Sequence, residues 1–219
     1  MSVSDASGPT MIGLAAPAKS QFVQTANIGA ATAMAKSVLA ARSDARIGQI
    51  IGMPGTGKSD AGRHIAREFG AVRVCAWANM GRRALLAEIG TALGIVGTYG
   101  ADDLTARILK HCPGQLIIVD EANHLRWNVI EAVRIFVDEG LAGLILIGTD
   151  LLKRKFHSAK TEIYLAQMSQ RIGAKRVTFE PMRSAQEVAG YVIEPRFGQV
   201  SAKTATCRFA AGGPAPDGT

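Results

Sequence analysis

The sequence predicts an α/β fold in which a parallel sheet is flanked by helices, and three observations support this prediction. Short apolar runs alternate along the chain with stretches of helical periodicity. Two of these runs, 116–119 and 144–147, contain no polar residue, which is typical of strands buried on both faces. The first run, 47–51, leads directly into a glycine-rich loop that opens a helix.

The expected elements cover most of the chain. Strands are predicted at 47–51, 72–77, 116–119, 144–147 and 176–179. Helices are predicted at 21–43, 59–69, 80–93, from Asp102 or Asp103 as the cap to 111, and at 128–138, 151–157, 161–170 and 184–192. We expect 1–20 to be a flexible arm, 21–182 a nucleotide-binding domain, 183–199 the start of a further helical unit and 200–219 a disordered tail.

Composition narrows the class of protein. The 219 residues carry a net charge of +7, and 151–176 contains seven basic residues against one acid. A net positive charge favours polyanionic partners such as nucleic acid, or an anionic membrane surface.

The three cysteines, Cys75, Cys112 and Cys207, support neither a disulfide framework nor a zinc site. No signal peptide or membrane span is recognisable, so we expect a cytoplasmic location without membrane association.

The glycine-rich loop at 52–59 is the most constrained chemical signal in the sequence. Glycines let the backbone wrap so that successive N–H groups face a phosphate, and the following helix adds its positive N-terminal end. The alternative is a glycine-rich turn, but the strand before the loop and the helix after it favour an ATP-binding loop. Lys58 is expected to reach the β- and γ-phosphates and Ser59 to ligate Mg²⁺. The expected nucleotide-binding set is Gly52, Pro54, Gly55, Thr56, Gly57, Lys58, Ser59 and Asp60.

An acidic pair ends the strand at 116–119. Ligands of open α/β sheets bind at the carboxyl edge, where Asp120 and Glu121 stand. Adjacent strand residues point in opposite directions, so the two carboxylates serve different roles. Asp120 is expected to hold Mg²⁺ through water, and Glu121 to activate the attacking water as a general base. The alternative, in which Asp120 only caps the next helix, is weaker once the glycine loop is present.

Two further positions complete the expected catalytic set. Thr149 ends the next buried strand and could sense the γ-phosphate or position water, a role that Asp150 could also fill. A helix cap is an equally weighted alternative for Thr149. Arg171 lies between a helix and the last strand and could enter a neighbouring subunit's site as an arginine finger. Its alternatives are a solvated surface charge and a phosphate contact.

Five basic residues are candidates for contacts with the DNA backbone. They are Arg82, Arg83, Lys153, Arg154 and Lys155, although such runs more often form a solvated face. Trp77 and Trp127 could stack on a base, but packing is the stronger interpretation. His124 has no partner spaced for metal binding.

The order of these motifs resembles the AAA+ ATPases of the phage Mu transposition protein B and TniB group. The segments are GMPGTGKS, LIIVDEANHL, LILIGTDLL and QRIGAKRV, and the lead-in Phe22–Asn27 fits the same group. The resemblance covers roughly 20–182. In that group, Walker A maps onto Gly57, Lys58 and Ser59, Walker B onto Asp120 and Glu121, a sensor onto Thr149 and a trans-acting arginine onto Arg171.

The resemblance implies a P-loop ATPase that oligomerises on DNA as a ring or filament, selects the target site and activates a transposase. Its cofactors would be ATP and Mg²⁺, with slow, DNA-stimulated hydrolysis. The group's phage protein carries a helical DNA-binding domain ahead of the ATPase, where only a short arm is expected here. The helical lid that usually follows the last strand is expected to be reduced or incomplete, starting at 183–199.

Parts of the sequence pattern also suit three other functions. The DEAN motif is similar to a helicase box, but superfamily 2 helicases need two tandem domains, which 219 residues cannot hold. An ExeA-like secretion ATPase shares the core pattern but would normally carry a membrane segment. The third alternative is a non-enzymatic protein: a switch in which ATP binding alone assembles the protein on DNA, without hydrolysis that matters.

Overall fold

The computed structural model describes residues 23–42, 45–139, 141–158, 161–182 and 184–193. The predicted arm at 1–20 and tail at 200–219 lie outside these ranges. The chain divides into two units, and the one that holds the sheet is Gln24–Pro181. In the other unit, the described helical residues are α9 (Ala185–Val188) and a π-helical turn, η3 (Ala189–Ile193), in agreement with the helix predicted over 184–192.

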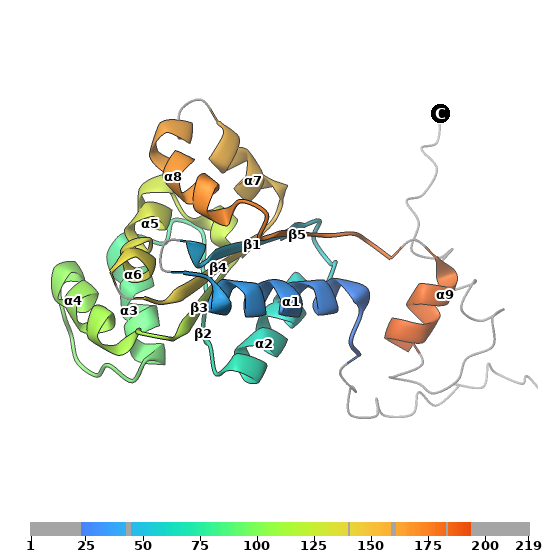
Figure 1. Cartoon of the computed structure of the whole chain (residues 1–219), viewed down its shortest axis with the longest axis horizontal. Coiled ribbons are helices and arrows are strands. Elements are labelled where there is room, and N and C mark those ends of the chain that lie inside the picture. The colour runs from blue at the N-terminus through green and yellow to red at the C-terminus, as the bar shows by residue number, and fades with distance from the viewer. Residues whose placement is uncertain (1–22, 43–44, 140, 159–160, 183, 194–219) are drawn as a thin grey trace, which may run out of the picture. The chain divides into compact units, whose positions relative to one another are not determined.

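A five-stranded, fully parallel sheet forms the centre of the larger unit, which confirms the predicted fold class (Figure 1). Its spatial order is β2-β3-β4-β1-β5. Because the strands run in the same direction, the loops after their carboxyl ends gather at one edge. The strands are β1 (Ile47–Gly52), β2 (Val72–Cys75), β3 (Leu116–Asp120), β4 (Gly143–Gly148) and β5 (Arg176–Phe179).

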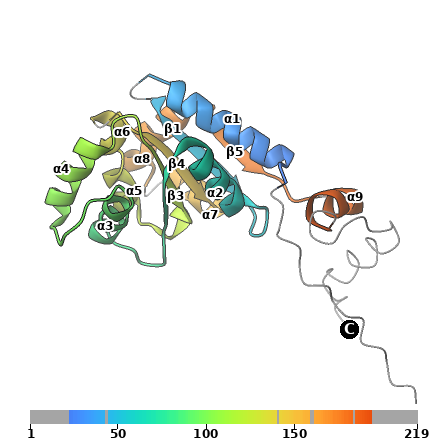
Figure 2. The same cartoon turned by 90° about the horizontal axis from the view of Figure 1, so that it is seen from below.

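Helices connect the strands and cover both faces of the sheet (Figure 2). They are α1 (Ala26–Ala40), α2 (Lys58–Phe69), α3 (Arg82–Ala92), α4 (Ala101–His111), α5 (Trp127–Ala132), α6 (Ile135–Asp138), α7 (Asp150–His157) and α8 (Glu162–Ile172). A three-residue 3₁₀ turn, η2 (Ala122–His124), follows β3. The predicted elements are therefore present, and most of their ends differ from the prediction by a few residues.

Two helix predictions need correction. The single helix expected at 128–138 is broken between α5 and α6, where backbone bonds of the i to i+3 type, from Val133 to Ile130 and from Phe136 to Val133, tighten the chain. Asp102 and Asp103 do not cap α4, because the cap is Gly100. Both acids lie in the first turn instead, where negative charge favours the helix dipole.

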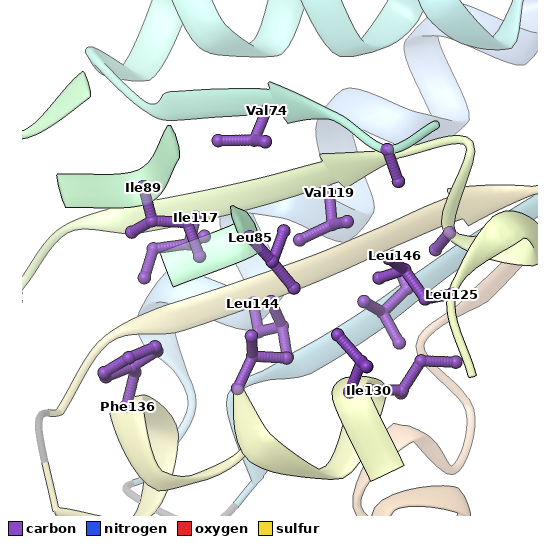
Figure 3. Close-up of a cluster of buried hydrophobic side chains, with 14 of the residues drawn as sticks. Val74, Leu85, Ile89, Ile117, Val119, Leu125, Ile130, Phe136, Leu144 and Leu146 are labelled. Carbon is purple, nitrogen blue, oxygen red and sulfur yellow. The ribbon is translucent and has the colours of Figure 1, made fainter. Parts of the chain in front are cut away.

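The core has two layers, one on each face of the sheet. In one layer, α1 and α2 pack against Ile118 and Ile145. In the other layer, the six helices from α3 through α8 pack against neighbouring residues of the same strands. Figure 3 shows the second layer, in which Ile117 and Val119 of β3 lie beside Leu144 and Leu146 of β4 on the same face of the sheet. Since successive strand residues alternate between these layers, the uninterrupted apolar runs follow from burial on both faces.

Candidate nucleotide-binding site

The loop between β1 and α2 has the backbone geometry of a phosphate cradle. Gly55 and Gly57 have positive φ angles of 79° and 86°, which side chains other than glycine rarely adopt. At Gly52, a Cβ atom would lie 2.7 Å from the carbonyl oxygen of Phe179 in β5. Glycine at 55 and 57 therefore serves the turn, and glycine at 52 serves close packing between neighbouring strands.

Lys58 is the first residue of α2, and its side chain bonds back to this loop. Its ammonium group donates a 2.7 Å hydrogen bond to the carbonyl of Met53, and the residue is only 6% exposed. Burial lowers the pKa of Lys58, while the nearby carboxylates of Glu121, Asp120 and Asp150 act to raise it. The predicted phosphate-binding lysine and the predicted acidic pair thus share one electrostatic environment.

The other loop residues differ in their exposure. The Thr56 hydroxyl donates to the Met53 carbonyl at 2.8 Å, and Ser59 is half-buried. Pro54 is exposed. Asp60 is exposed and pairs with Arg63 of the same helix at 2.5 Å, so its carboxylate is engaged on the surface of α2.

Asp120 is buried at the end of β3, and both of its carboxylate oxygens have partners. One oxygen accepts the backbone N–H of Glu121 at 2.9 Å, and the other pairs with Arg73 of β2 at 2.5 Å. Sequence reasoning missed Arg73. The signal available was a lone cation between Val72 and Val74 in a strand whose apolar residues face inward.

Glu121 leaves the strand in a left-handed conformation, with φ at 54°. Its half-buried carboxylate lies 3.8 Å from the ring of His124, whereas Asp120 is 1% exposed. The two acids therefore differ in burial and in backbone conformation, and the different roles expected for them stay a prediction. Among the described residues, no group of three or more potential metal-ligating side chains forms around His124 or elsewhere.

Thr149 precedes α7, and its side chain makes no capping bond. Its backbone N–H donates to the Asn123 side chain at 3.1 Å. Its hydroxyl oxygen is buried, and no hydrogen bond reaches it within the described part of the chain. A buried hydroxyl without a partner at the carboxyl edge of the sheet is available to a ligand. Asp150, the alternative, is exposed in the first turn of α7.

Arg171 is held within its own chain. Its guanidinium group forms an ion pair with Asp138, which also pairs with Arg134. The side chains of Arg171 and Asp138 are 22% and 24% exposed, so the cluster is largely shielded from water. In this arrangement Arg171 fastens the end of α8 to α6.

The five candidates for DNA contact fall into two groups. Arg82 is exposed and pairs with Asp102 at 3.2 Å, while exposed Arg83 donates to the Tyr99 carbonyl at 3.1 Å. Lys153 and Arg154 are exposed on α7. Lys155 differs from the prediction of a surface cation, because its ammonium group is half-buried and bonds to backbone carbonyls after β3.

The two tryptophans also differ. Trp127 stacks on Tyr164 with ring centroids 4.0 Å apart, which confirms packing as its role. Trp77 follows β2 and is 50% exposed. No helix in the described residues is long and apolar enough to cross a membrane.

A family comparison agrees with this geometry, since residues 41–156 match the family described as AAA domain. The chain belongs to the AAA domain family. The matched region includes the glycine loop, the acidic pair and Thr149. The predicted motifs of a nucleotide-binding domain therefore all lie within the AAA domain.

Comparison with curated proteins points to a narrower group. The AAA chain is 37% identical over 110 residues to the Mu-like prophage FluMu DNA transposition protein B of Haemophilus influenzae. The match covers 46% of this chain and 37% of the relative. The resemblance to the transposition protein B group is thereby confirmed.

Two solved structures are similar at low sequence identity. The Pif1 helicase of Candida albicans is 18% identical with a TM-score of 0.39, covering 74% of this chain and 41% of the helicase. A structure of two coordinating Pif1 helicases at forked DNA is 15% identical with a TM-score of 0.43, covering 82% of this chain and 50% of that chain.

Proposed function

We propose that this AAA protein binds ATP with Mg²⁺, hydrolyses it slowly with stimulation by DNA, and oligomerises on DNA to select transposition targets and activate a transposase. The observation that supports the proposal most directly is the placement of Lys58, Asp120 and Glu121 at the same carboxyl edge of a parallel sheet, after β1 and β3. The similarity to a DNA transposition protein B supplies the biological setting.

The chain's own residues fit a nucleotide. The backbone N–H groups at 55–59 would bind the phosphates, and Lys58 would exchange its bond to the Met53 carbonyl for phosphate oxygens. The unpartnered hydroxyl of Thr149 would meet the γ-phosphate or the attacking water. Ser59 and Asp120 would hold Mg²⁺, which neutralises charge on the phosphates when bound. Glu121, less buried than Asp120, would orient and deprotonate water.

DNA binding and assembly rest on surface charge and on the relative. Arg82, Arg83, Lys153 and Arg154 are exposed and would contact backbone phosphates. Arg171 would act in trans on a neighbouring subunit after release from Asp138. A cytoplasmic location follows from these partners as part of the same proposal.

The decisive experiment compares wild type with Glu121→Gln. We expect the variant to bind ATP as wild type does and to lose turnover by roughly 10²–10⁴-fold, because the base is removed while the phosphate loop stays intact. Unchanged turnover would remove Glu121 from the base role. Absence of turnover in wild type, with ATP-dependent DNA binding retained, would favour the non-hydrolysing switch.

The transposition part needs its own measurement. DNA binding is measured with ATP, with ADP and without nucleotide, followed by imaging of the assemblies on DNA. We expect ATP-dependent rings or filaments, and binding that weakens steeply with salt because phosphate contacts release counterions. DNA binding that does not depend on nucleotide, or no DNA binding, would contradict the transposition role and favour the ExeA-like secretion alternative.

A further inference from the structure

The turn after β3 holds Glu121 in a conformation that its surroundings must fix. A non-glycine residue with φ at 54° persists only where neighbouring contacts over-determine it. The turn closes with hydrogen bonds from His124 N–H to the Glu121 carbonyl at 2.9 Å and from Leu125 N–H to the Ala122 carbonyl at 3.1 Å. These two bonds alone do not tie the turn to the rest of the domain.

Lys155 of α7 supplies such a tie. Its ammonium group donates to the carbonyl of Asn123 at 2.5 Å and also to the carbonyl of Leu125. Carbonyl groups at the end of a helical turn lack partners within it, and a cation is favourable there. Lys155 thus satisfies the end of η2 from a helix that follows a different strand.

The environment of Lys155 sets it apart from its neighbours on α7. Lys153 and Arg154 are exposed, whereas Lys155 is half-buried and burial lowers the pKa of its ammonium group. A buried ammonium group is costly unless it is hydrogen-bonded, and the two carbonyls meet that need. The Thr161 hydroxyl in turn donates to the backbone carbonyl of Lys155.

The side chain of Asn123 ties the same turn to the end of β4. Its Oδ1 atom accepts the backbone N–H of Thr149 at 3.1 Å. A Cβ atom at Gly148 would lie 2.8 Å from that oxygen, so the close approach depends on glycine. Two bonds from Lys155 and one to Thr149 therefore position the turn that begins at Glu121.

We propose that Lys155 is a positioning residue for Glu121 and belongs to the hydrolytic machinery, not to the DNA-contact surface. The inference rests on the proposed hydrolysis of ATP. Loss of the two carbonyl bonds would let the turn move while leaving the phosphate loop unchanged. A displacement of about 1 Å in a catalytic group can lower a rate on the order of 100-fold.

The test compares Lys155→Met with Lys110→Met, which removes an exposed lysine of α4. We expect K155M to lower kcat for ATP by roughly 10-fold to 100-fold with KM within about twofold of wild type. Its DNA affinity should stay within about twofold, whereas Lys153→Met should weaken DNA binding severalfold and reduce its salt dependence. K110M should match wild type in turnover.

Hydrogen exchange gives a second readout that does not depend on activity. The amide protons of His124 and Leu125 should exchange faster in K155M than in K110M. If K155M does not fold, Lys155→Gln keeps a donor for one carbonyl and should show a smaller loss of kcat. The positioning role would be overturned if K155M hydrolysed ATP as fast as wild type, or if it lost only DNA affinity. Absence of wild-type turnover would overturn the proposed hydrolysis itself.

Discussion

The guanidinium group of Arg73 lies 2.5 Å from the Oδ2 atom of Asp120, on the neighbouring parallel strand. Only 2% of the Asp120 side chain and 23% of the Arg73 side chain are exposed. The carboxylate predicted to hold Mg²⁺ is therefore already paired with a cation, Arg73 of β2. A buried carboxylate without a paired charge would be strongly unfavourable, so the ion pair with Arg73 offsets the cost of burying Asp120.

Arg73→Met should destabilise the domain by about 3 kcal/mol, because it leaves the buried charge of Asp120 unpaired. The free energy of unfolding in urea measures this loss. The double variant with Asp120→Asn should recover part of it, since no charge then remains to be paired, giving a coupling energy above about 1 kcal/mol. Additive losses from the two substitutions would contradict a direct energetic link between the residues.

Lys58→Met should weaken ATP binding by roughly 10-fold to 100-fold, since it removes charge-assisted hydrogen bonds worth about 1.5–3 kcal/mol. The free energy of unfolding should not fall, because burial lowers the pKa of Lys58 and so disfavours its charged form in the folded chain. Binding of a fluorescent ATP analogue and urea unfolding check the two parts. K110M is the matched control, and an equal loss of affinity there would refute a specific role.

Gly52→Ala should destabilise the domain by about 1–3 kcal/mol, because its Cβ would press on the backbone of Phe179 at 2.7 Å. Gly29→Ala is the contrasting control. Nothing lies within 4 Å of a Cβ at Gly29 in α1, so alanine there should stabilise the chain by about 0.5–1 kcal/mol. Urea unfolding of both variants tests the pair, and equal effects would show that packing at Gly52 does not constrain the loop.

The elements that could be predicted from sequence are those with local signals. The glycine loop and the acidic pair are each recognisable from a few consecutive residues, and the apolar runs of β3 and β4 reflect burial on both faces of the sheet. The break between α5 and α6 was missed because the apolar periodicity continues through Val133 and Phe136, which both pack in the core.

Contacts between strands distant in sequence could not be predicted. Arg73 reaches Asp120 only because β2 lies beside β3, and Lys155 reaches Asn123 only because α7 follows β4, the other neighbour of β3. A basic run on a helix gives no local sign of which residue turns inward. For that reason Lys155 resembled Lys153 and Arg154 in the sequence and differs from them in the fold.

The hypothesis that Arg171 acts in trans predicts complementation between two inactive variants. Arg171→Ala and Glu121→Gln should each lack turnover, and their mixture should regain a measurable fraction in the presence of DNA. In the mixed oligomer, an R171A subunit supplies Glu121 and an E121Q neighbour supplies Arg171. The double variant mixed with R171A is the control, because no subunit then offers Arg171, and it should remain inactive.

Within its own chain Arg171 pairs with Asp138, so its loss could also act through stability. Arg134→Ala separates the two effects, because Arg134 pairs with the same carboxylate. We expect both variants to lower the free energy of unfolding by about 1–3 kcal/mol, and only R171A to abolish turnover below the unfolding transition. If R171A retains turnover while losing stability as R134A does, Arg171 fastens α8 to α6 and the arginine-finger hypothesis is wrong.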